Sequence, residues 1–123
     1  MLAKAILWIS AAAFVSYGLM CLFDPNVPAE FAGLQIANGD GYSELGAMYG
    51  GLQTGFGLFC ALGALRAELQ RPVLVSLVLM MGGLALGRLY STVTGIESVG
   101  GYTYGAMAFE FAIAILSALA LRK

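Results

Sequence analysis

Four stretches of the chain are apolar over roughly the length that a helix needs to cross a membrane. They cover residues 3–23, 44–65, 73–94 and 104–121. A helix crosses the hydrocarbon core of a bilayer in about 20 mostly apolar residues. Because the chain has only 123 residues, these stretches make up most of it and leave room for one domain. The sequence therefore predicts an all-α fold, an integral membrane bundle of four transmembrane helices formed as a single domain over residues 1–123.

The polar side chains are too few to cover the surface of a soluble domain. Charged residues make up 11% of the chain, whereas a soluble domain carries about 25%. Histidine is absent, which excludes histidine-based catalytic triads and the histidine-containing zinc and haem sites. A formal net charge of −1 without a basic run argues against a nucleic-acid partner. We expect no metal, no cofactor and no identifiable catalytic residue, and whether the protein is an enzyme stays open.

The basic residues predict the orientation of the bundle. Five of the six lie at the ends of the apolar stretches, on one side of the membrane: Lys4, Arg66, Arg71, Arg122 and Lys123. The loops 24–43 and 95–103 on the other side contain no basic residue. Since Lys and Arg accumulate in cytoplasmic loops, we expect both termini in the cytoplasm and a multi-pass location.

The two longer connections contain residues that start and stop helices. In the first loop, Pro28 suits the first turn of a short helix and Gly33 its end, so we expect an interfacial helix over residues 28–34. The segment 37–41 is rich in turn residues, and residues 42–44 after it are expected to start the second helix. Pro72 closes a tight inner turn and stands where the third helix is expected to begin.

Small residues on the second and third stretches favour close helix packing. Glycines four residues apart occur as Gly46 with Gly50, Gly51 with Gly55, and Gly83 with Gly87. Such spacing puts small residues on one helix stripe, where two backbones can approach closely. The packing lies either inside the bundle or between subunits, and in the second case these glycine-rich faces form a homo-oligomer.

One basic and one acidic residue are left inside the predicted membrane spans. Arg88 lies six residues before the outer end of the third stretch, and Glu110 six residues after the outer start of the fourth. Both are therefore about 9 Å below the outer boundary, and we expect them to pair. Charges inside a bilayer are costly and mark a functional site by default, although such a pair can also simply fix helix register.

Other polar residues share the outer half of the membrane with this pair. The candidate ligand-binding residues are Arg88, Glu110, Gln53, Tyr49, Glu44, Tyr17 and Tyr90. We expect them, with Ser91 and Thr92, to line a cavity that opens outward. Gln53 follows Tyr42, Gly46 and Tyr49 on one helical stripe, at spacings of three and four. Glu44 falls on the opposite side of an ideal helix from Gln53 and is within reach of Arg88 as a competing carboxylate.

Several short motifs resemble a known family. They are Leu22-Phe23-Asp24-Pro25, Glu44 followed by Tyr49-Gly50-Gly51-Leu52, Gly63-Ala64-Leu65-Arg66, Gly87-Arg88-Leu89 and Phe109-Glu110. Together they resemble a family of small bacterial four-helix membrane proteins, domain of unknown function 4345, and more distantly the DoxX-like proteins. The resemblance implies a four-helix bundle in the bacterial plasma (inner) membrane and no established activity. The family often has an arginine where this chain has Gly46.

The sequence leaves several functions open. We favour a binding protein that holds an amphipathic lipid- or quinone-like molecule in an outward-facing cavity around Arg88 and Glu110. Its partners are then membrane lipids or an amphipathic small molecule. The alternatives are an accessory or structural subunit of a membrane complex, and a small proton-coupled transporter. Multidrug transporters of this size carry their essential glutamate in the first span, where this chain has no acid.

Overall fold

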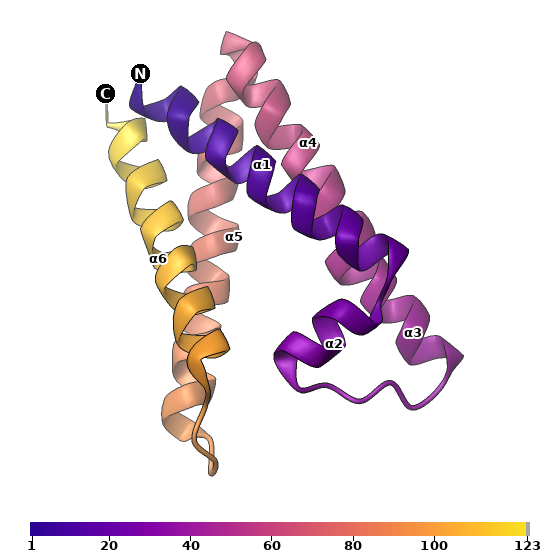
Figure 1. The fold of residues 1–123 in the computed structure, drawn as a ribbon. Helices are drawn as coiled ribbons and strands as arrows, with labels where there is room; N and C mark the ends of the chain where they lie inside the picture. The colour runs from indigo at the N-terminus through magenta and orange to yellow at the C-terminus, as the bar shows by residue number, and fades with distance from the viewer. Residues whose placement is uncertain (123) are drawn as a thin grey trace. The chain divides into compact units, whose positions relative to one another are not determined.

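The computed structural model describes residues 1–122, and within that range the regular structure is entirely helical (Figure 1). The elements are α1 (Leu2–Phe23), α2 (Asn26–Ala32), α3 (Gly39–Leu45), the π-helix η1 (Gly46–Gly51), α4 (Leu52–Leu65), α5 (Ala67–Thr94) and α6 (Gly101–Leu121). The all-helical prediction is confirmed.

Three of these helices, α1, α5 and α6, are long and apolar enough to cross a membrane. The second apolar stretch takes a different form, because α4 alone has only 14 residues. It continues without a break from α3 and η1, so that residues 39–65 are helical throughout. Three candidate spans indicate a membrane protein.

The chain divides into two compact units. The middle unit is Trp8–Leu62. The hairpin unit consists of Met1–Leu7 and the chain from Gly63 onward, and it contains α5 and α6.

In the middle unit, α1 packs against η1 and α4 through glycines. A Cβ added at Gly50 would stand 2.6 Å from Cα of Leu22, and one at Gly57 would stand 2.7 Å from Cγ2 of Val15. No side chain fits at either position. Within this unit, no atom lies within 4 Å of a Cβ added at Gly51 or Gly55. On η1 and α4, the two glycines that pack closely against α1 are therefore seven residues apart, and the pair Gly51 and Gly55, four residues apart, makes no such contact.

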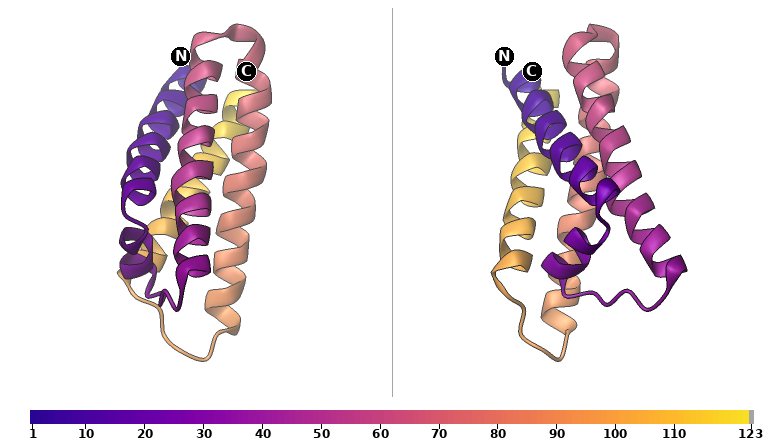
Figure 2. Two further views of the ribbon diagram at one scale, coloured as in Figure 1. Left: turned by 90° about the vertical axis from the view of Figure 1, so that its right-hand side faces the viewer. Right: turned by 45° about the vertical axis from the view of Figure 1, so that its right-hand side comes forward.

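In the hairpin unit, α5 and α6 lie side by side and run in opposite directions (Figures 1 and 2). Each helix buries residues at spacings of three and four, the pattern of one helix face. On α5 these are Val73, Leu74, Leu77, Met81 and Ala85, and on α6 they are Glu110, Ile113, Ala114, Ser117 and Ala120.

The third helix begins earlier than predicted. Helix α5 starts at Ala67, so Pro72 lies inside it instead of at its start. Pro72 is the sixth residue of α5, beyond the first turn, so its missing N–H leaves the Glu68 carbonyl without its usual helical hydrogen bond. The turn itself is tight, because a Cβ at Gly63 would stand 2.7 Å from Cγ2 of Val73.

The first loop contains more helix than predicted. Helix α2 begins at Asn26, two residues before the predicted start, and Gly33 ends it in the left-handed conformation with φ 68°. The sequence predicts a turn over residues 37–41, but α3 already begins at Gly39. Asn38 explains the early start, since its side chain accepts a hydrogen bond from the Gly41 N–H and caps the helix.

Candidate functional site

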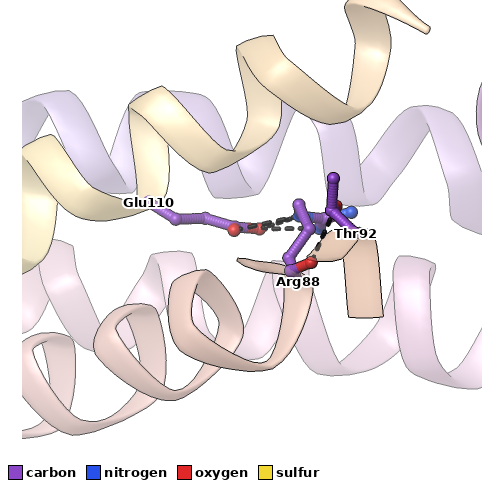
Figure 3. Close-up of polar contacts among 3 residues, drawn as sticks. All are labelled: Arg88, Thr92 and Glu110. Carbon is purple, nitrogen blue, oxygen red and sulfur yellow. Dashed lines mark hydrogen bonds and ion pairs between the residues drawn. The ribbon is translucent and has the colours of Figure 1, made fainter. Parts of the chain in front are cut away.

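Arg88 and Glu110 form an ion pair across the α5–α6 hairpin (Figure 3). Nε of Arg88 donates to both carboxylate oxygens of Glu110, at 3.0 and 3.2 Å. Nη2 of Arg88 donates to Oε1 of Glu110 at 2.7 Å. One edge of the guanidinium therefore binds the carboxylate in the two-pronged geometry that makes such pairs strong and directional.

The sequence positions both side chains through the buried faces of their helices. Ala85 lies four residues after Met81, and Arg88 lies three residues after Ala85. Arg88 therefore continues the buried face of α5. Glu110 is the first buried residue of the stripe on α6. Because the helices are antiparallel, the end of one stripe meets the start of the other. The pairing expected from equal depth is present.

The two partners differ in exposure. The side chain of Glu110 is 6% exposed, whereas that of Arg88 is 28% exposed. In the segments 73–94 and 104–121 they are the only charged residues. The pair is therefore neutral as a whole, and the part of it that is accessible is the guanidinium, a group with hydrogen-bond donors only.

Of the residues on α5 near Arg88, Thr92 lies one turn further on the same face and Tyr90 lies on another face. Thr92 donates through Oγ1 to the Arg88 carbonyl at 2.8 Å, so its hydroxyl is used within the helix (Figure 3). Tyr90 is 71% exposed. It lies two residues from Arg88, about 160° around the helix axis. A part for Tyr90 in binding stays a prediction.

The remaining predicted site residues, Tyr17, Glu44, Tyr49 and Gln53, belong to the middle unit. Tyr17, Tyr49 and Gln53 are partly buried, and Glu44 is exposed. Arg88 and Glu110 belong to the hairpin unit, and a site shared between these residues and the ion pair stays a prediction.

The π-helix η1 changes which of these residues share a face. A π-helical turn holds one residue more than an α-helical turn, so residues on its two sides are rotated relative to each other by about 100°. Glu44 precedes η1 and Gln53 follows it. They are opposite on an ideal α-helix but only about 80° apart after this correction. The stripe predicted from Tyr42 to Gln53 is broken by the same rotation.

An open apolar groove of about 460 Å³ lies between α5 and α6 in the hairpin unit. Its lining is Val78, Leu79, Gly82, Gly83, Leu86, Ala114, Ile115 and Ala118. Leu79, Gly83 and Leu86 lie about 140–180° around α5 from Arg88. The groove therefore opens on a different face of the hairpin and is not the predicted cavity around the ion pair.

Two buried hydroxyls add polar groups to the helices. Ser10 and Ser117 are both 0% exposed, and their Oγ atoms have no hydrogen-bond partner among residues 1–122. The sequence analysis did not single out Ser10, although this serine lies on the same face of α1 as the buried Ile6 and Leu7.

Cys21 and Cys60 are buried free thiols. The described residues contain no group of three metal-ligating side chains.

A family model covers almost the whole chain. Residues 2–121 match the family described as "Domain of unknown function (DUF4345)", and the chain belongs to this family. The match spans the ion pair and both units. No curated protein and no solved structure matches the chain.

Proposed function

We propose that this member of the family binds the polar head of an amphipathic, lipid- or quinone-like molecule at the Arg88–Glu110 pair. The supporting observation is the unequal exposure of the two partners. Glu110 is nearly inaccessible, while 28% of the Arg88 side chain is exposed in a hairpin without any other charge in segments 73–94 and 104–121. A ligand that lies along the apolar helices thus finds one strong polar contact at Arg88.

Residues other than the ion pair complete the proposed site. We propose that Gln53, Tyr49, Glu44 and Tyr17 of the middle unit contribute to a cavity that opens outward in the membrane. The rotation across η1 turns Glu44 toward the side of Gln53, which supports a joint part for these two residues.

The proposed site requires a defined topology. We propose four membrane spans, with residues 39–65 forming the second, both termini in the cytoplasm, and the bacterial plasma membrane as the location. The distribution of the basic residues supports this orientation. Reporter fusions test it: a fusion after the C-terminus is expected to be active only with a cytoplasmic reporter.

Thermal unfolding of the purified protein tests the binding function. A ligand that binds only the folded state raises stability by about 2.7 kcal/mol at a hundredfold excess over its Kd. We expect a decyl-substituted benzoquinone to raise the Tm of the wild type and not that of Arg88→Gln. Arg71→Gln is the matched control, because Arg71 is an exposed arginine on the same helix, outside the proposed site. An equal shift in Arg88→Gln and the wild type would contradict the proposal.

A second candidate function is a structural or accessory subunit, in which the ion pair only holds α5 and α6 in register. The two-pronged geometry favours it, since the bonds described satisfy both oxygens of Glu110 within the hairpin. The exchange Arg88→Glu with Glu110→Arg separates the two functions. If the exchange variant regains the stability of the wild type and still associates fully into a membrane complex, the structural function is supported. If it regains stability but its Tm no longer rises with added ligand, the binding function is supported.

A further inference from the structure

An arginine stands in line with the α5 wall of the apolar groove. Val78 and Gly82, which line the groove, lie seven and eleven residues after Arg71 on α5. These spacings are close to whole numbers of helical turns, so both residues lie within about 20° of Arg71 around the helix axis. Arg71 is exposed and precedes the groove by about 10 Å along the helix. The groove and Arg71 therefore share one face of α5.

A second arginine stands in the same relation to the α6 wall. Ile115 and Ala118 of the groove lie seven and four residues before Arg122. Arg122 follows α6 directly and keeps a helical backbone, with φ −81° and ψ −13°. The two groove residues are thus within about 20° and 40° of Arg122 around the axis of α6. Because the helices are antiparallel, Arg71 and Arg122 lie at the same end of the groove (Figure 1).

A hydrogen bond joins the two helices at this end. Nη1 of Arg71 donates to the carbonyl of Leu121, the residue before Arg122, at 3.5 Å. A guanidinium carries five N–H donors, so this long bond occupies only one of them. Within residues 1–122, no carboxylate forms an ion pair with Arg71 or Arg122, although Glu68 lies three residues before Arg71. The remaining donors of Arg71 and those of Arg122 can therefore bind an added anion.

The basic end and the apolar groove suit opposite parts of one molecule. Segments 63–73 and 119–123 contain four basic residues and one acidic residue. The groove, about 460 Å³ in volume, has an apolar lining, and it is hollow because small residues meet there. A Cβ added at Gly82 would stand 4.0 Å from Cβ of Ala114. A phosphate head group matches the basic end, since arginine binds phosphate through paired hydrogen bonds, and an acyl chain matches the groove.

We infer that the hairpin unit binds an anionic phospholipid, with the phosphate between Arg71 and Arg122 and one acyl chain in the groove. Since α5 and α6 are long and apolar enough to cross a membrane, the arginines lie at head-group depth and the groove lies in the hydrocarbon. Basic pockets between transmembrane helices bind anionic head groups in this way. The site is separate from that of the proposed function, because Arg88 lies about 25 Å along α5 and about 100° around it from Arg71.

Native mass spectrometry of the full chain in an uncharged detergent tests the inference. The probes are dioleoyl phosphatidylglycerol, which is anionic, and dioleoyl phosphatidylcholine, which has the same chains and no net charge. We expect the wild type to bind the first at least about tenfold more tightly than the second, a difference of about 1.4 kcal/mol. Glycerol phosphate, which carries the anion without acyl chains, is expected not to displace phosphatidylglycerol at the same concentration.

Replacing the arginines separates this site from general surface charge. Arg71→Gln and Arg122→Gln are each expected to weaken binding of phosphatidylglycerol, and together to lower it to the level of phosphatidylcholine. Arg66→Gln is the matched control for the single variants. Arg66 is an exposed arginine at the same end of the hairpin, but it precedes α5 in an extended conformation and is not part of the groove.

Gly82→Leu tests the groove itself. The leucine side chain fills the hollow and is expected to weaken binding of both phospholipids, while circular dichroism and the Tm without lipid report whether the variant is folded. If Gly82→Leu does not fold, the arginine variants decide, because they change exposed side chains only.

Four results would overturn the inference. The first is equal binding of the two phospholipids by the wild type. The second is a loss of phosphatidylglycerol binding in Arg66→Gln as large as in Arg71→Gln, which indicates attraction to surface charge alone. The third is unchanged binding in a folded Gly82→Leu. The fourth is a dimer in the same spectra that Gly82→Leu abolishes, which indicates that a second copy of the chain covers the groove.

Discussion

Gly57 of α4 lies directly against Val15 of α1, where a Cβ on the glycine would stand 2.7 Å from Cγ2 and 2.8 Å from the backbone nitrogen of the valine. The side chain and backbone of Val15 therefore pack directly on the backbone of α4, with no room for a side chain on the glycine. In a membrane, where lipid tails are as apolar as leucine, such close packing is a main source of helix association. The contact between α1 and α4 depends on this glycine.

We predict that Gly57→Ala destabilises the protein by about 1–3 kcal/mol, the usual cost of overfilling a close-packed site. The added methyl group collides with the backbone of α1, which cannot move aside as a flexible side chain can. The measurement is the midpoint of thermal or denaturant unfolding in detergent micelles.

Gly55→Ala is the matched control, since no atom of the middle unit lies within 4 Å of a Cβ added at this position. It changes the same residue type on the same helix, two positions away. We expect it to be neutral or stabilising, because alanine favours helix over glycine by up to about 1 kcal/mol. Equal effects of the two substitutions would refute the close contact.

The end of α2 depends on Gly33, which adopts φ 68°. We predict that Gly33→Ala weakens α2 by about 1–2 kcal/mol, because a Cβ is unfavourable in the left-handed conformation. Gly33→Asn is expected to lose less, since asparagine tolerates that conformation better. Hydrogen exchange of the α2 amides measures the effect, with the amides of α6 as an internal reference that should not change.

The sequence predicted where helices form but not how they join. Long apolar stretches require helices, so α1, α5 and α6 lie close to the predicted ranges. Boundaries depend on local capping and packing, which hydropathy does not report. Asn38 caps α3, which begins at Gly39, five residues before the predicted helix start at residue 44. Helix α5 extends N-terminally past Pro72, although this proline removes one hydrogen bond from the helix.

The ion pair was predictable for a different reason. Arg88 and Glu110 stand at equal distances from a loop between antiparallel helices, and counting residues along the helices is enough to match their depths. Residues 46–51 do not allow such counting, since their composition does not reveal the extra residue in the π-helix. The face shared by Glu44 and Gln53 therefore could not be derived from their spacing.

The glycines of α5 offer a test of self-association. Within the hairpin unit, no atom lies within 4 Å of a Cβ added at Gly83 or Gly87. If these glycines pack between subunits, the wild type is expected to form an oligomer in detergent that native mass spectrometry detects. Gly83→Ile is then expected to abolish this oligomer and to leave the Tm of the chain unchanged. A loss of Tm without a change of oligomeric state would show instead that another part of the same chain covers this face.

Single and double replacements of Arg88 and Glu110 separate stability from binding. Arg88→Met leaves the buried carboxylate of Glu110 without its partner, and breaking such a pair costs about 3–5 kcal/mol. Arg88→Met with Glu110→Leu removes both charges, and such apolar replacements are often neutral or stabilising. We therefore expect the double variant to recover most of the lost Tm in detergent. If the pair serves ligand binding, the recovered protein no longer responds to the decyl-substituted benzoquinone. A double variant that regains both its Tm and the response of the wild type would show that neither side chain contacts the ligand.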